Sequence, residues 1–244
     1  MSSLQSISNR GAPALLCAAA LMLGSVSSWP LAASAAEDEP DPQDARLIER
    51  AQLQVADAAA LVERMRADAA LAQYLQHARA ILLVPRFAKG ALLLGAAKGG
   101  GVLIARRQGR WSDPAFYALH GISIGLQAGG AHGALAMLLM SDKALEAFRS
   151  NDHTWTLHAG GGLTIASFNG EPLQQVEPDV IVWSDVRGLF AGLAFNALGV
   201  TPNDAQNQAY YQSPVAPLQI LIGAASNPQA AVLRDAFDPR LAAQ

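Results

Sequence analysis

The 244-residue chain has few of the residues on which disulfide-bonded, metal-binding and strongly charged proteins depend. A single cysteine, Cys17, excludes an internal disulfide and a multi-cysteine zinc site. Aromatic residues make up only 6% of the chain, so we expect a core of aliphatic side chains and closely packed backbone. The five histidines form no H-E-x-x-H or similar pattern, and we expect neither a metal nor a cofactor. With a formal net charge of −3, we expect no nucleic-acid partner.

Residues 1–36 are expected to form an export signal. A polar start with Arg10 precedes an apolar run from Ala14 to Leu23, and Ala33 to Ala36 supply the small residues of a cleavage site. The apolar run is too short to span a bilayer. We expect cleavage near Ala35 or Ala36 and a periplasmic or secreted product, from which Cys17 has been removed. The sequence gives no indication of an oligomeric state.

The rest of the chain is expected to comprise an acidic leader at 37–43, one domain at 44–213 and a tail at 214–244, whose short helix starts near Asn227. Apolar residues spaced by three and four indicate a first helix, which either packs on its own domain or inserts into a membrane. A second short helix is expected near Asp68 to His77, and from Ala80 onward the apolar period changes to two. The order predicts an α+β fold: N-terminal helices packed on a curled, largely antiparallel β-sheet or small barrel, with a short C-terminal helix. The first helical stripe consists of Ile48, Ala51, Val55, Ala58, Val62 and Met65.

The uncharged run from Gly121 to Met140 permits two interpretations. Its glycines recur every four residues, at Gly121, Gly125, Gly129 and Gly133, as in a transmembrane helix of small-xxx-small type. The first half, however, alternates with period two, and so many glycines would weaken a helix. We therefore predict strands here.

Arg79 to Trp111 holds seven of the chain's 17 basic residues and no acidic residue. We call it the acid-free segment. Basic residues alternate with apolar runs, which predicts a β-hairpin hinged on Lys98–Gly101 that presents cations and apolar groups on one surface. The triple glycine could bind a phosphate through its backbone N–H groups. The predicted binding residues are Arg86, Lys89, Lys98, Gly99, Gly100, Gly101, Arg106, Arg107 and Arg110.

One pattern suggests catalysis. Gly121–Gly125 matches the G-x-S-x-G motif of serine hydrolases, with Ser123 as its nucleophile. That motif requires a sharp turn between a strand and a helix, whereas the alternation predicts Ser123 in the middle of a strand. We therefore expect no catalytic residues and no enzyme, and keep a serine esterase as an alternative.

Six further motifs occur in order along the chain. They are Ala80–Pro85, Ala88–Gly90, Gly99–Leu103, Gly109–Phe116, Ser123–Gly129 and Gly188–Gly192. Together they resemble the SYLF domain family over most of residues 45–213. The resemblance implies a lipid-binding domain: eukaryotic members bind phosphoinositides and in some cases actin, and bacterial members are exported.

The charge pattern and the resemblance imply the same function. We expect an exported protein that binds anionic phospholipids or phosphoinositides through the acid-free segment, as a peripheral membrane contact. The alternative, from another class of function, is a protein-interaction module of the cell envelope. Such a module would bind its partner through the acidic leader or through residues 203–244.

Overall fold

A computed structural model describes residues 42–92, 94–124, 131–149, 155–157, 163–168, 170, 173, 177–185 and 198–238. For residues 89–92, 94–97, 122–124, 131, 147, 155–157 and 198 it describes the backbone alone. The expected export signal and the leader up to residue 41 lie outside these ranges. The described residues all belong to one structural unit, Pro40–Gln244.

Two helices open the fold. The first, α1 (Pro42–Arg66), has a proline at its first position, where the missing N–H is not needed. The second, α2 (Ala69–His77), begins at Asp68, whose side chain accepts hydrogen bonds from the backbone N–H groups of Ala70 and Leu71. Both predicted helices are confirmed. The described part of the chain contains no helix long and apolar enough to cross a membrane.

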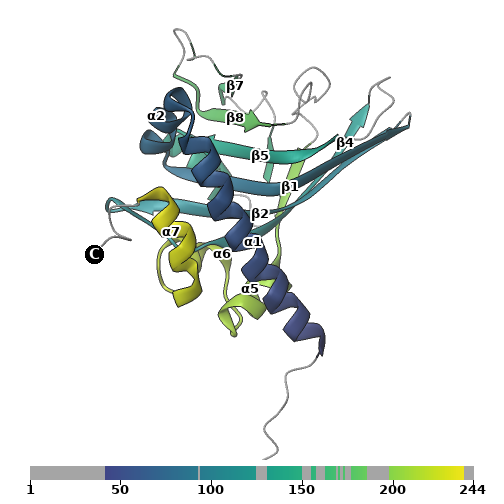
Figure 1. Ribbon diagram of the computed structural model, residues 1–244, viewed down its shortest axis with the longest axis vertical. Helices are drawn as coiled ribbons and strands as arrows, with labels where there is room; N and C mark the ends of the chain where they lie inside the picture. The colour runs from purple at the N-terminus through teal and green to yellow at the C-terminus, as the bar shows by residue number, and fades with distance from the viewer. Residues whose placement is uncertain are drawn as a thin grey trace, which may run out of the picture. The chain divides into compact units, whose positions relative to one another are not determined.

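A largely antiparallel sheet follows (Figure 1). Its strands lie in the order β6-β9-β4-β2-β1-β5-β8-β7, with β3 pairing β2 off this path, and β7 and β8 are parallel. The two end strands, β6 and β7, do not pair among the described residues, so the sheet is curled and open rather than a closed barrel. The strands are β1 (Ala80–Leu92), β2 (Leu94–Arg107), β3 (Arg110–Trp111), β4 (Ala115–Ile124), β5 (Ala131–Leu139), β6 (Trp155–Leu157), β7 (Ile165–Phe168), β8 (Val180–Ser184) and β9 (Leu198–Pro202).

Further helices complete the fold. They are α3 (Asp142–Arg149), α5 (Asp204–Tyr211), α6 (Pro217–Leu221), the 3₁₀ turn η3 (Pro228–Ala230) and α7 (Ala231–Phe237). Asn227 caps η3, as predicted for the start of the last helix. Ile220 and Leu221 of α6 and Leu233 of α7 are buried in the core. The boundary expected after residue 213 therefore does not separate two structural units.

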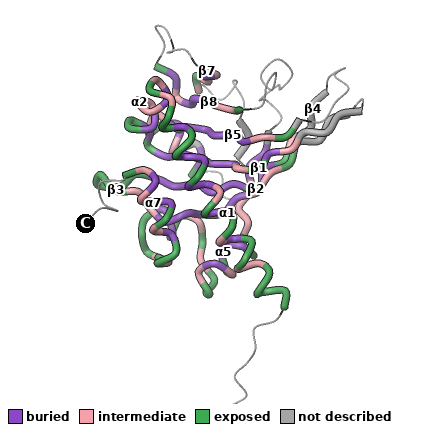
Figure 2. Tube along the Cα trace, in the orientation of Figure 1, coloured by how far each residue is buried: buried purple, intermediate pink, exposed green. Residues whose placement is uncertain are grey.

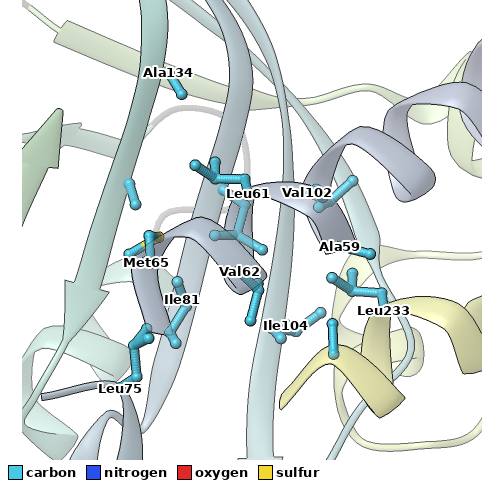
Figure 3. Packing of buried hydrophobic residues seen from close by; sticks show 14 of the residues in the cluster. Ala59, Leu61, Val62, Met65, Leu75, Ile81, Val102, Ile104, Ala134 and Leu233 are labelled. Carbon is cyan, nitrogen blue, oxygen red and sulfur yellow. The ribbon is translucent and has the colours of Figure 1, made fainter. Parts of the chain in front are cut away.

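Alternating strand residues build a core on each face of the sheet. Figure 2 shows that long stretches of β1, β2 and β5 are buried. Ile81, Leu83, Val102 and Ile104 pack against α1, α2 and α7, and we call this side the helix face. Figure 3 shows Leu61, Val62 and Met65 of α1 over Ile81, Val102 and Ile104 of the strands, with Leu233 of α7 beside them. On the other face, Leu82, Leu103 and Met137 pack with residues of α3 and α6. The first helix thus packs on its own domain.

The acid-free segment forms the predicted hairpin, but its turn is not at the triple glycine. β1 and β2 pair from Ala80↔Ala105 to Leu92↔Leu94, so the chain reverses between Leu92 and Leu94. Gly99 to Gly101 lie inside β2, between β1 and β4. The prediction of a hinge at Lys98–Gly101 is therefore wrong.

A register shift at Pro85 decides which way Arg86 points. The pairing of β1 with β2 is irregular between Leu83 and Arg86, where proline has no N–H for the ladder. An extra residue moves all later side chains to the opposite face. Arg86 consequently lies on the helix face, next to α1, instead of sharing the face of Leu82 and Val84.

Candidate functional site

The cations of the acid-free segment fall into two groups at different ends of the hairpin. Arg79, Arg106, Arg107 and Arg110 form the inner group, and the Arg106 N–H donates to the Arg79 carbonyl at 2.7 Å. Arg86, Lys89 and Lys98 form the outer group; Arg86 is paired with Gly100. Gly100 lies six residues from Arg106 along β2, or about 20 Å at the usual rise per strand residue. The single basic surface expected from the sequence is therefore divided.

Two inner arginines hold helix ends in place. Arg106 Nη1 donates to the Gln76 carbonyl in the last turn of α2 at 2.7 Å, and its guanidinium lies 4.6 Å from the Trp111 ring centroid. Burial lowers the pKa of Arg106 below the usual arginine value. Arg107 Nη1 donates to the Ile222 carbonyl at the end of α6. Cations at helix C-termini stabilise the carbonyl ends, so both residues have a structural role.

The other two inner cations differ in their surroundings. Arg79 Nε lies 3.5 Å from Asp142 Oδ1. Arg110 is exposed and has no polar partner among the described residues. It lines a cleft of about 800 Å³ with Arg106 at the end of the sheet beside α7. The other charged residues of this cleft are Arg66, Arg234, Asp235 and Asp238.

The outer group is more open. The Arg86 side chain is 76% exposed, and its Nη2 lies 2.6 Å from Oδ2 of Asp57 in α1. Lys98 is exposed and has no partner in the part of the chain that the structure describes. The Lys89 backbone pairs with Ala97 in β2 and Ala131 in β5, and its side chain lies outside the description. Of the two outer cations whose side chains the structure describes, Lys98 is therefore the one free to meet a ligand.

Two histidines lie in the same row of the sheet as Lys98. Ala88 pairs with both Lys98 and His132, and Lys98 pairs with His120, so the row runs His132, Ala88, Lys98, His120 across four strands. Directly opposed residues share a face, and all three polar side chains are exposed. We call Arg86, Lys98, His120 and His132 the outer band. The sequence pattern missed the histidines because only strand register brings them next to Lys98.

Beyond Lys89, which follows the Lys98 row by one residue, the hairpin and the end of β4 carry no charged residue. Residues 90–97 of the hairpin and 121–124 of β4 contain no acidic or basic side chain. Their backbones pair up to Leu94↔Ile124 and Leu92↔Leu94. In Figure 1 the outer ends of β1, β2 and β4 extend beyond the helices that cover the sheet. The outer band therefore borders an uncharged sheet end.

The triple glycine serves packing instead of phosphate binding through its N–H groups. A Cβ on Gly99 would lie 2.8 Å from Val84 Cγ1, and one on Gly101 would lie 3.1 Å from Leu82 Cδ1. Both residues pair with β1 or β4 on either side of β2, so their backbone belongs to the sheet ladder. The expectation of a phosphate-binding glycine loop is wrong. Gly100 faces α1, where its Cβ would meet the Gln54 side chain at 3.1 Å.

The described residues give no support for the catalytic alternative. Ser123 lies inside β4, where its backbone pairs with Gly95, rather than at a turn between a strand and a helix. Within the ranges that the structure describes, no three His, Cys, Asp or Glu side chains form a group that could hold a metal ion.

Comparisons with known proteins show which family the chain is similar to. Residues 120–238, from β4 to α7, match the family model Ysc84, described as "Las17-binding protein actin regulator". The chain is 28% identical over 158 residues to SH3 domain-containing YSC84-like protein 1 of Bos taurus and 28% over 157 residues to that of Homo sapiens. It is 27% identical over 175 residues to Protein YSC84 of Saccharomyces cerevisiae.

These matches cover part of each protein. The two mammalian alignments include 62% of this chain and 46% and 44% of the relatives, and the yeast alignment includes 68% and 36%. The chain thus spans less than half the length of these relatives. No solved structure matches it. The family match over residues 120–238 and these relatives show that the chain is similar to Ysc84 proteins, in agreement with the resemblance of its six motifs to the SYLF domain family.

Proposed function

We propose that this protein binds the surface of membranes containing anionic phospholipids, with lipid phosphates contacting the outer band. The observation that carries the proposal is the position of exposed cationic and imidazole groups next to an uncharged sheet end. A bilayer surface is arranged in the same order, with phosphate groups next to the boundary of the apolar acyl chains. We propose export as well, from the signal-like residues 1–36, so that the lipids of an envelope membrane or of a host would be available.

The outer band suits reversible adsorption. A lysine or arginine close to an anionic membrane contributes about 1 kcal/mol, so Arg86 and Lys98 together supply about 2 kcal/mol. The neighbouring residues 90–97 and 121–124 contain no charged residue that would oppose contact with the acyl boundary. The inner arginines are less suited, because Arg106 and Arg107 already bind the ends of α2 and α6.

Lys98→Glu tests this surface, with Arg110→Glu as its matched control. Both changes reverse one exposed cation of the acid-free segment that has no partner among the described residues. Lys98→Glu removes one attraction and adds one repulsion, about 2 kcal/mol, so vesicle affinity should fall roughly 30-fold. The assay is co-sedimentation with phosphatidylglycerol, cardiolipin and phosphoinositide vesicles, compared with phosphatidylcholine vesicles. An equal loss of vesicle affinity in both variants, or no loss in Lys98→Glu, would refute membrane binding through the outer band.

Salt dependence separates lipid adsorption from the protein-interaction alternative. Exposed charges are screened within about 8 Å at physiological ionic strength, so vesicle binding should weaken steeply as salt rises. Binding that is equal on neutral and anionic vesicles, or unchanged by salt, would argue for the interaction module instead.

A further inference from the structure

A small pocket lies on the helix face, one step inward from the row of Lys98, His120 and His132. Its volume is about 320 Å³, at the lower end of the range for small-ligand sites. Arg86 lines the pocket. Because Arg86 pairs with Gly100, it lies two residues from the Lys98 row, roughly 7 Å along the strand. The lining residues are Arg50, Leu53, Gln54, Asp57, Pro85, Arg86, Gly100 and Gln206.

The pocket contains a buried hydrogen-bond donor without a partner. Nε2 of Gln54 is buried and makes no hydrogen bond with the described residues. Its Oε1 accepts from Gln206 Nε2 at 2.9 Å. Buried polar groups are normally hydrogen-bonded, so this amide lacks an acceptor.

A chain of hydrogen bonds fixes which end of the Gln54 amide is free. The backbone N–H of Gln206 donates to Asn203 Oδ1 at 3.2 Å, which identifies the oxygen of Asn203. Asn203 Nδ2 then donates to Gln206 Oε1 at 3.0 Å, and Gln206 donates to Gln54. Reversing Gln54 would bring two NH₂ groups together. The unpartnered group is therefore a donor, and its missing partner is an acceptor.

Glycine at position 100 keeps this amide in place. A Cβ there would lie 3.1 Å from Gln54 Oε1 and 3.3 Å from its Nε2. Those distances are shorter than ordinary van der Waals contacts, so any side chain at Gly100 would press on the amide. Of the three glycines predicted to bind phosphate, Gly100 has a place beside a pocket, through its missing side chain rather than its N–H.

The charges around the pocket favour an anion. Arg50 and Arg86 contribute two positive charges, and Asp57 contributes one negative charge. Arg86 carries five N–H donors in a planar fork, so its contact with Asp57 leaves donors for a second anion. Phosphate oxygens accept several hydrogen bonds at once and suit such a set of donors.

We propose that this pocket binds one phosphate group, with Arg50 and Arg86 as its cationic contacts and the Gln54 amide donating to a phosphate oxygen or to a water held beneath it. The phosphate belongs either to a phospholipid headgroup or to a free phosphate ester. The lipid source rests on the proposed function, because a headgroup reaches the pocket only if the outer band faces a membrane. Asp57 then orients Arg86 while weakening the binding of the anion.

The test measures binding of inorganic phosphate by calorimetry and binding of phosphatidylglycerol vesicles by co-sedimentation. Arg50→Gln and Arg86→Gln should each weaken phosphate binding about tenfold, since each removes charge-assisted hydrogen bonds. Asp57→Asn should strengthen it. Arg46→Gln is the matched control: it makes the same change at another exposed position of α1, four residues from Arg50 and outside the pocket lining, and should leave binding within twofold.

The outcomes distinguish the pocket from the membrane surface. Phosphate binding that is equal in Arg50→Gln, Arg86→Gln and Arg46→Gln would overturn the pocket, and so would a parent chain that binds no phosphate. If vesicle binding still fell in Lys98→Glu, the proposed function would stand without the pocket. Phosphate binding that depends on Arg50 in a chain that binds no vesicles would support the pocket with a free phosphate ester as its ligand.

Discussion

Asn207 of α5 takes the place of a β-strand beside β4, which makes it a sensitive position. The strand β9 ends at Pro202, paired with Tyr117, and the next backbone N–H, that of Asn203, donates to the Phe116 carbonyl. The buried Asn207 side chain continues the ladder: Oδ1 accepts from the Phe116 N–H at 2.8 Å and Nδ2 donates to the Phe116 carbonyl at 3.1 Å. We predict that Asn207→Ala substantially destabilises the protein.

The magnitude follows from the partners that remain. The Phe116 carbonyl still accepts from the Asn203 N–H at 2.9 Å, so that atom loses one bond, worth about 1 kcal/mol. The Phe116 N–H loses its side-chain acceptor inside the core, which costs about 1–3 kcal/mol. The sum, about 2–4 kcal/mol, is a large part of the 5–15 kcal/mol typical of domains.

Urea unfolding followed by circular dichroism measures this loss, with Gln208→Ala as the control. Gln208 is exposed on the same helix, so its truncation should change the free energy of unfolding by less than about 0.5 kcal/mol. A similarly small change in Asn207→Ala would refute the role of the amide as a strand substitute. Because α5 carries Gln206, Asn207→Ala should weaken phosphate binding in the pocket as well.

Two further predictions concern stability. Gly99→Ala should lower the free energy of unfolding by about 1–3 kcal/mol, because the new Cβ would lie 2.8 Å from Val84 Cγ1. Adding Val84→Ala should recover part of this loss, as measured by urea unfolding. If the double variant recovers none of it, the contact with Val84 is not the cause. Burial, with the Asp204 carboxylate second, raises the pKa of Tyr117 above its usual value near 10. The folded state favours the neutral phenol, so the contribution of Tyr117 to the free energy of unfolding is fully present below pH 10. As the pH rises further, this contribution declines by up to about 1.4 kcal/mol per pH unit. Tyr117→Phe should therefore flatten the alkaline decline in unfolding free energy; equal slopes in both chains would exclude this origin.

Much of the local structure was predictable because it depends on neighbouring residues. The three-and-four spacing from Ile48 to Met65 predicts α1, and the period-two alternation after Ala80 predicts the strands. Ser141 illustrates a capping signal: its Oγ accepts from the Ala144 N–H at 3.1 Å at the start of α3. The alternation also predicts a strand at Leu189–Leu198, which lies outside the described residues except for Leu198 at the start of β9.

The candidate site was only partly predictable, because its parts meet through long-range pairing. The sequence shows the acid-free segment, but not that Arg106 and Arg107 bind helix ends while Arg86 and Lys98 remain at the other end of the hairpin. It placed the turn at the triple glycine, since glycine is common in turns. In the fold, glycine is required at these positions because a Cβ would crowd Val84, Leu82 and Gln54, and no local sequence pattern reveals these contacts.

The amino-acid sequence by itself determined the helices, the strands, the resemblance to the SYLF domain family and the gathering of cations in one segment, because periodicity, capping and composition act over a few residues. The tertiary structure alone decided which cations face outward together. The irregular pairing at Pro85 turned Arg86 toward Asp57, strand register aligned His132, Lys98 and His120, and α5 brought Gln206 to Gln54. These relations join residues up to 152 positions apart, so they exist only once the sheet and its helices have packed.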